Sequence, residues 1–323
     1  MALPAPFVFG WREVFIPLAV VVHDQHGPAL VMAGLAVAAA RVGSWLVTRG
    51  SAPRRVRSGA LLAALALFLL GLTPEEGPAG LLLWLVFGIA WSLVEIALVA
   101  HPVPQRVAEL ALLAGMALAG PLAQGPGAWL IAALCLGIAW RVGPAREAAP
   151  GGEIAERPET PGPLARWLPF LFSASYMTWF WLVPARLLQE EMALGMIGVL
   201  AATHWLARLL TARFSGDQTT TWQAAAALAL AVLLAVNTFI AGTVVATVLF
   251  LILSGLALGV VAGGRSIARP DAGQRPGESQ ALGDVFGPAA GALLVLVFGQ
   301  PAAYIAGALA AAATALVLVK GVR

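Results

Sequence analysis

Long apolar stretches separated by short polar breaks run through the whole chain. The hydrocarbon core of a bilayer requires about 20 apolar residues in a helix, and most of the stretches approach that length. The breaks contain Pro, Gly and charged residues, as at 74–78 and 125–127, which favours turns. The pattern therefore predicts an all-α, polytopic membrane protein with twelve transmembrane helices. These helices are expected at residues 4–22, 28–48, 58–73, 78–100, 105–123, 126–142, 164–184, 191–212, 221–238, 242–263, 279–298 and 300–319.

One polar stretch, residues 143–163, is longer than the others. It is rich in Pro, Gly, Glu and Ala and has no apolar period, which is typical of a flexible linker. It divides the predicted helices into two groups of six. We therefore expect an N-terminal six-helix half at 1–142, a cytoplasmic linker at 143–163 and a C-terminal six-helix half at 164–323.

The two halves repeat each other at a constant offset of 167 residues, without a gap. Parallel repeats of six helices are typical of transporters whose halves are related by an axis along the membrane normal. The sequence therefore predicts two pseudo-symmetric six-helix bundles. The matched positions are Pro17 and Pro184, Arg41 and Arg208, Gly88 and Gly255, Ala90 and Ala257, and the Gly-Pro pairs at 120–121 and 287–288.

The connections between the predicted helices alternate in charge. Arg and Lys resist translocation, so connections that carry them are expected in the cytoplasm. Both termini then lie in the cytoplasm, and the chain is expected in the plasma membrane, the inner membrane of a bacterium. The basic set holds Arg49, Arg54, Arg55, Arg57, Arg106, Arg141, Arg146, Arg157, Arg166, Arg213, Arg265, Arg269, Arg275, Lys320 and Arg323. The other set holds Asp24, Glu75, Glu76, Glu190 and Glu191, with Arg186 as its basic residue.

The composition supports a membrane protein and argues against a nucleic-acid-binding one. The chain is 60% hydrophobic and 11% charged, whereas a soluble domain has about 25% charged residues. The net charge is +3, but the arginines lie between apolar segments and form no continuous basic stripe, so no nucleic-acid partner is expected. No basic region precedes the first apolar stretch, so no cleaved signal peptide is expected.

Motifs for enzymatic chemistry are missing from the sequence. It contains no HExxH, no GxSxG and no phosphate-binding loop, so neither an enzyme, with catalytic residues, nor an ATP-driven pump is expected. Cys135 is the single cysteine and cannot form an intrachain disulfide or a metal site by itself. We expect no metal and no cofactor.

Two glycine-containing segments carry a resemblance to a known family. Residues 43–50, followed by two arginines at 54–55, are similar to the basic turn between helices 2 and 3 of the major facilitator superfamily, with Thr48 in place of the family's usual acid. The predicted fifth helix carries a Gly-Pro pattern at 115–125 that resembles the signature of the superfamily's proton-coupled exporters. A similar pattern occurs at 283–291. With the six-plus-six arrangement, the resemblance covers essentially the whole chain.

The resemblance implies a monomeric secondary transporter that works by alternating access. Its expected partners are a small organic molecule, amphipathic or charged, protons and the lipid bilayer. The exporter-like pattern implies antiport against protons. The alternative is a non-transporting relative of the same fold that acts as a membrane scaffold or as an assembly or cofactor-delivery factor.

A charged residue inside a predicted membrane helix costs roughly 2.5–3.5 kcal/mol on insertion scales, so each one needs a reason. Glu13 is a candidate for proton coupling, and Arg12 for binding an anionic substrate or pairing with Glu13. Alternatively, both belong to a structural network, or the first helix begins later. Glu95 is a second candidate proton site, one turn from the candidate substrate contact Trp91, or it forms a salt bridge with Arg41 or Arg106.

Further candidates lie on the seventh and eighth predicted helices. Tyr176, Trp179 and Phe180 share one helical face, where aromatic rings can hold an amphipathic or cationic substrate. Alternatively, they face lipid near the membrane boundary. His204 is a candidate proton relay, or a packed, hydrogen-bonded core residue.

The resemblance also implies a gate of charged residues, because helix 2 faces helix 11 and helix 8 faces helix 5 in the superfamily. Asp284 on helix 11 is then opposite Arg41 and Arg49 on helix 2. Likewise, Glu109 on helix 5 is opposite Arg208 and Arg213 on helix 8. We expect these pairs to close the cytoplasmic side. Alternatively, each acid pairs within its own half or caps its helix N-terminus.

Overall fold

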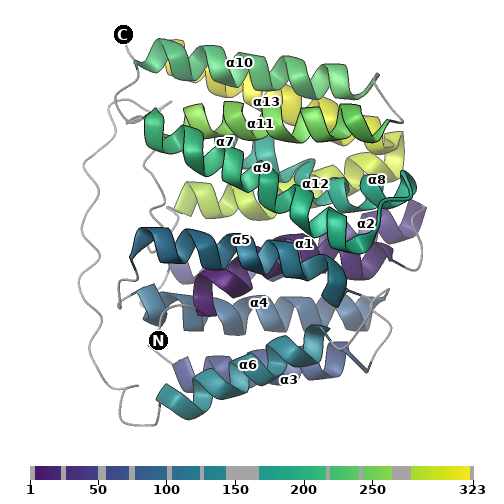
Figure 1. Ribbon diagram of the computed structural model, residues 1–323, viewed down its shortest axis with the longest axis vertical. Helices are drawn as coiled ribbons and strands as arrows, with labels where there is room; N and C mark the ends of the chain where they lie inside the picture. The colour runs from purple at the N-terminus through teal and green to yellow at the C-terminus, as the bar shows by residue number, and fades with distance from the viewer. Residues whose placement is uncertain are drawn as a thin grey trace.

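The computed structural model describes residues 4–22, 27–49, 56–72, 77–99, 104–123, 127–142, 167–215, 219–239, 243–263 and 278–320. Within these ranges every regular element is a helix. The helices run across the long axis of the molecule, side by side in layers (Figure 1). They are α1 (Pro4–Val21), α2 (Gly27–Arg49), α3 (Val56–Leu70), α4 (Pro78–Val99), α5 (Gln105–Leu122), α6 (Gly127–Val142), α7 (Leu168–Met177), α8 (Val183–Gln189), α9 (Leu194–Phe214), α10 (Thr220–Asn237), α11 (Val244–Gly263), α12 (Glu278–Phe298) and α13 (Gln300–Lys320).

Each predicted segment except the seventh corresponds to one helix, with ends that differ by a few residues. The seventh, expected as one helix over 164–184, is divided into α7, the 3₁₀ turn η3 (Phe180–Leu182) and α8, which continues to Gln189. Two side chains explain the break. The hydroxyl of Thr178 donates to the carbonyl of Ala174 at 2.5 Å, which bends a helix, and Pro184 has no N–H to continue the hydrogen-bond ladder.

Helices α1–α6 pack against one another, and so do helices α7–α13. The two groups meet mainly along two helix pairs, α2 with α12 and α5 with α9, and also where α1 and α2 touch α8 and η3. The 167-residue offset relates α2 to α9 and α5 to α12, so the two contacts are equivalent under the repeat. The linker 143–163 lies outside the described residues, and the boundaries of the two halves stay a prediction.

Glycines allow α5 and α9 to approach closely. A Cβ atom on Gly198 would lie 2.6 Å from the carbonyl oxygens of Met116 and Ala117, and one on Gly120 would overlap the carbonyl of Leu194. Small residues at such contacts let helices pack tightly in lipid, where dispersion replaces the hydrophobic effect as the driving force. The Gly120-Pro121 pair therefore serves packing between the two groups of helices.

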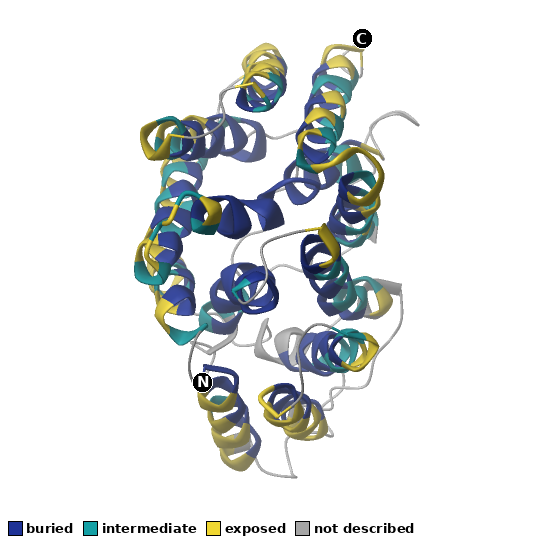
Figure 2. Ribbon diagram, turned by 90° about the vertical axis from the view of Figure 1, so that its right-hand side faces the viewer, coloured by how far each residue is buried: buried dark blue, intermediate teal, exposed yellow. Residues whose placement is uncertain are grey.

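Exposed positions lie on the outer side of the helices, and buried positions face inward (Figure 2). Many of the exposed side chains are large and apolar. Trp140, Phe214 and Phe239 are more than 80% exposed. Among the described residues, six helices are long and apolar enough to cross a membrane: α2, α9, α10, α11, α12 and α13. Three shorter apolar helices accompany them. The chain is a multi-pass membrane protein.

The last turns of α6, α9 and α13 carry Arg141, Arg213 and Lys320. All three helices end on the left-hand side of Figure 1, where α1 also begins. We call this side the basic end of the helices and the other side the opposite end.

Candidate functional site

Four buried charged side chains meet where α1, α2 and α12 come together. Arg41 on α2 donates through Nη2 to Glu13 on α1 and, through Nη1, to Asp284 on α12 at 3.4 Å. Arg12 approaches the same Glu13 oxygen through Nε at 3.5 Å. Ser173 on α7 donates its hydroxyl proton to the other oxygen of Asp284. We call Arg12, Glu13, Arg41 and Asp284 the central charge cluster.

Every member of the central charge cluster is at least nine-tenths buried. Removing an ion from water costs several kcal/mol even after relaxation, so these charges persist only because they neutralise one another. Arg41 is central to the cluster, because its guanidinium forms ion pairs with one carboxylate from each group of helices. Helix α1 begins at Pro4, which places Arg12 and Glu13 in the middle of the helix and not at its start.

An aromatic ring lies against both arginines of the cluster. The guanidinium carbons of Arg12 and Arg41 are 4.7 Å and 5.0 Å from the ring centroid of Phe9. Cation–π attraction of this kind is strongest where water is excluded. Phe9 was not among the residues selected from the sequence. The repeat offered a signal for it, because the 167-residue offset relates Phe9 to the candidate Tyr176.

A second ion pair joins the two groups of helices nearer the basic end. Arg213 on α9 pairs with Glu109 on α5, which also accepts a hydrogen bond from Gln105 at 3.0 Å. The side chain of Arg213 is 39% exposed, so solvent screens this pair more than Arg41–Asp284. Both pairs cross between the groups at α2–α12 and α5–α9. Their function as a gate stays a prediction.

Arg208 is not part of either ion pair. Its guanidinium carbon lies 4.4 Å from the ring centroid of Trp205, 5.2 Å from that of Tyr176 and 5.5 Å from that of Phe172. Trp205 donates its indole proton to the hydroxyl oxygen of Tyr176 at 2.9 Å. Arg208 is 9% exposed and has no hydrogen bond or ion pair with any described residue.

The predicted aromatic face of the seventh segment packs inside the protein. Tyr176, Trp179 and Phe180 are buried, and they surround His204 with ring centroids 5.2–6.0 Å from the imidazole. The alternative that these rings face lipid is therefore wrong. They come from the end of α7 and the start of η3, beside the break in the segment.

His204 is fully buried and hydrogen-bonded. Its Nδ1 lies 2.8 Å from the carbonyl oxygen of Leu251, which can only accept, so Nδ1 carries the proton in the neutral ring. Nε2 then has a lone pair and no partner among the described residues. The carbonyl fixes the tautomer, and the ring nitrogen left over is enclosed by aromatic side chains.

The remaining candidates from the sequence lie away from the central charge cluster or outside the described residues. Trp91 on α4 is buried and stacks on Phe87 at 6.4 Å between centroids, within the first group of helices. The side chains of Glu95 and Arg49 lie outside the described residues. In the described part of the chain, no three His, Cys, Asp or Glu side chains are grouped as metal ligands would be.

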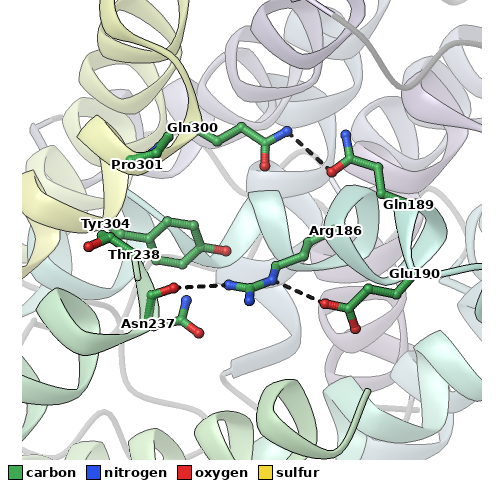
Figure 3. A pocket seen from close by; sticks show the side chains of 8 residues that line it. All are labelled: Arg186, Gln189, Glu190, Asn237, Thr238, Gln300, Pro301 and Tyr304. Carbon is green, nitrogen blue, oxygen red and sulfur yellow. Dashed lines mark hydrogen bonds and ion pairs between the residues drawn. The ribbon is translucent and has the colours of Figure 1, made fainter. Parts of the chain in front are cut away.

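A cavity of about 440 Å³ opens between α8, α10 and α13 (Figure 3). Arg186 lies in it and donates to Glu190 at 3.3 Å and to the carbonyl of Asn237 at 3.5 Å. The hydroxyl of Thr247 also donates to Glu190, at 2.8 Å. All residues lining the cavity belong to α8, α10, α13 and the turns next to them, within the second group of helices. From the sequence, Arg186 and Glu190 were expected only to mark membrane orientation.

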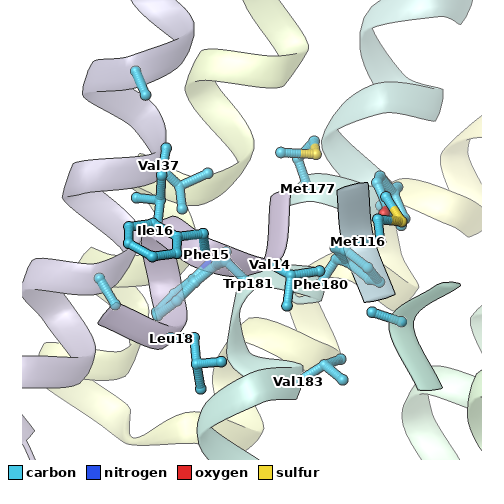
Figure 4. Packing of buried hydrophobic residues seen from close by; sticks show 14 of the residues in the cluster. Val14, Phe15, Ile16, Leu18, Val37, Met116, Met177, Phe180, Trp181 and Val183 are labelled. Carbon is cyan, nitrogen blue, oxygen red and sulfur yellow. The ribbon is translucent and has the colours of Figure 1, made fainter. Parts of the chain in front are cut away.

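Buried apolar side chains from both groups of helices pack together at the junction (Figure 4). Val14 and Phe15 on α1 and Met116 on α5 lie near Phe180 and Trp181 of η3. Val14 and Phe15 directly follow Glu13 of the central charge cluster in the sequence, so the charges lie beside this apolar packing. Any ionisable group there acts in a medium of low polarity, where each charge interacts more strongly than in water.

The comparisons with known proteins concern the fold. The sequence matches no family model, and no curated protein is significantly similar to it. The solved structures of the nucleoside transporter NupG, a bacterial metal transporter and a D-xylose-proton symporter are similar, with TM-scores of 0.70, 0.66 and 0.65. Sequence identities are 11%, 16% and 14%, and the alignments cover 100%, 99% and 99% of this chain and 98%, 96% and 96% of those chains. A likeness over the whole length of several such transporters shows that the chain has the major facilitator superfamily fold.

Proposed function

We propose that this protein is a secondary active transporter that moves a small charged or amphipathic organic molecule across the plasma membrane by alternating access. Its twelve membrane spans form two pseudo-symmetric six-helix bundles, and both termini are cytoplasmic. The central charge cluster at the junction of the two bundles carries this proposal. Ionisable residues inside a membrane protein are expensive and mark substrate or proton pathways.

The sharing of Arg41 between two acids supports proton coupling. While the bundles are closed at the basic end, Arg41 contacts Asp284 of one bundle and Glu13 of the other. Separation of α2 from α12 would break only the contact with Asp284 and leave Arg41 fully to Glu13. The protonation of the two carboxylates would then change with the opening of that end, which links a proton to the conformational cycle.

The glycine–proline pattern of α5 favours antiport, because it resembles the signature of proton-coupled exporters. Tyr176, Trp179 and Phe180 are the proposed substrate contacts, with His204 enclosed by their rings. A static membrane scaffold would have little need of a charge pair that spans its two halves. The experiment below separates the two functions.

Alternating access should appear as opposite distance changes at the two ends of the α5–α9 contact. Cys135 is the one cysteine, so Cys135→Ala gives a cysteine-free background. Spin labels would be placed at the exposed residues Arg106 and Phe214 for the basic end, and at Leu118 and Met196 for the opposite end. We expect one distance to lengthen and the other to shorten as the pH is changed in nanodiscs. Fixed distances at both ends across pH and a metabolite panel would contradict transport and support a scaffold.

The orientation of the protein is tested with reporter fusions. A periplasm-active phosphatase fused after Lys320 should be inactive, because the basic end is expected in the cytoplasm. The same reporter inserted after Phe239, between α10 and α11, should be active. Activity of the first fusion, or silence of the second with normal expression, would reject the proposed sidedness.

A further inference from the structure

Arg41 and Arg208 occupy equivalent places in the two halves and have equivalent aromatic neighbours. The 167-residue offset relates Arg41 to Arg208 and Phe9 to Tyr176. In the structure the guanidinium carbon of Arg41 lies 5.0 Å from the Phe9 ring, and that of Arg208 lies 5.2 Å from the Tyr176 ring. The repeat is therefore visible in side-chain packing as well as in the sequence.

The two arginines differ in their anionic partner. Arg41 pairs with Glu13, whereas the same offset places Phe180 at the position equivalent to Glu13. The C-terminal half thus keeps the buried cation and its aromatic neighbour but has Phe180 at the position where the N-terminal half has the carboxylate of Glu13. The described acids of the junction are already paired: Glu13 and Asp284 with Arg41, and Glu109 with Arg213.

An unpaired guanidinium that is nine-tenths buried is costly, and cation–π contacts offset only part of the cost. Among the described residues its nitrogens have no hydrogen-bond partner, yet they are not fully enclosed. The hydroxyl of Tyr176 is a second possible donor, because its ring lies beside the guanidinium. The oxygen of that hydroxyl accepts from Trp205, and its own proton has no acceptor in the described part of the chain.

We infer that Arg208 and Tyr176 form a binding site for the anionic group of the transported molecule, a carboxylate or a phosphate. This inference rests on the proposed transport function and names its substrate class. The planar guanidinium presents a fork of N–H groups that matches carboxylate and phosphate oxygens. The guanidinium carbon lies 4.4 Å from the ring centroid of Trp205, and the bound anion supplies the negative charge that Glu13 supplies to Arg41 in the N-terminal half.

The test uses the purified full chain in a buffer free of carboxylate and phosphate. Binding of small organic carboxylates, phosphate monoesters and their neutral amide or alcohol counterparts is measured by thermal unfolding and by titration. At least one anionic class should raise the unfolding temperature, and whichever class does so identifies the group. The neutral counterparts should have no effect. Arg208→Gln should weaken anion binding by about tenfold or more, the loss expected for a charge-assisted hydrogen bond.

Phe180→Glu tests the site more specifically, because it places a carboxylate in the C-terminal half at the position equivalent to Glu13. The new carboxylate should pair with Arg208, exclude the anionic ligand and leave the unliganded unfolding temperature close to that of the parent. Phe250→Glu is the matched control, since Phe250 is also buried but its ring contacts are with Trp179 and Tyr304, and none is with a described arginine. It should lower the unfolding temperature clearly.

Two results would overturn the inference: stabilisation by neutral or cationic compounds alone, or an equal loss of stability in Phe180→Glu and Phe250→Glu. The spin-label distances report alternating access without any assumption about charge. If those distances change while anions fail to bind, the transport proposal stands and only the substrate class is wrong.

Discussion

Glu13→Gln is expected to abolish proton-coupled transport. Glu13 is buried at the junction and shares Arg41 with Asp284, so its interaction with Arg41 changes when the Arg41–Asp284 contact opens. Proteoliposomes loaded with a pH-sensitive dye would be exposed to a panel of small organic anions. The parent should move protons in response to at least one compound, and the variant to none.

The same substitution is expected to destabilise the protein, because Arg41 loses one of its two carboxylates. Breaking a buried ion pair by removing one partner costs about 3–5 kcal/mol. The double variant Glu13→Gln/Arg41→Gln removes both charges and should recover part of the stability without recovering coupling. Proton movement with an unchanged pH dependence in either variant would assign Glu13 a purely structural part.

Asp284→Asn should shift the protein toward a state open at the basic end. The Arg41–Asp284 contact joins the two groups of helices, and both side chains are buried. Even half of the cost of a broken buried pair would change a balanced two-state equilibrium by about tenfold. With Met177→Cys in the Cys135→Ala background, labelling by a maleimide that cannot cross the membrane should become faster from the basic end.

Glu109→Gln provides a matched control for Asp284→Asn. It breaks the Arg213–Glu109 pair, which also crosses between the groups but is partly exposed to solvent. Exposed pairs contribute about 0–1 kcal/mol, so the labelling rate should change by only a few-fold. A larger effect for Glu109→Gln than for Asp284→Asn, or no effect of Asp284→Asn, would contradict a gate at Arg41–Asp284.

The tertiary structure also changes how a charge-reversal test should be designed. From the sequence, exchanging Arg41 and Asp284 would restore an isolated pair. In the structure Arg41 also pairs with Glu13, so a carboxylate at position 41 would face a second carboxylate. Two carboxylates in direct contact repel strongly in a medium of low polarity. Neutralising both partners is therefore the interpretable variant.

The sequence by itself determined the helices, their approximate ends and the presence of costly buried charges. Helix length follows from the thickness of the bilayer, and turns follow from Pro and Gly, so both can be predicted from local sequence. The repeat also related Arg41 to Arg208. The break in the seventh segment at Thr178 was not predicted, because a hydroxyl that donates to a carbonyl of its own helix leaves the apolar pattern of the sequence unchanged.

The partners of each charged side chain were decided by the tertiary structure alone. Arg41 and Asp284 are 243 residues apart, and whether they meet depends on how α2 and α12 rotate and slide against each other. The sequence offered Glu109 either Arg208 or Arg213, and packing paired it with Arg213. Arg208 lies among aromatic rings and pairs with no carboxylate of the described residues. A helix pattern fixes which residues share a face, but the register between helices comes from close packing across the whole junction.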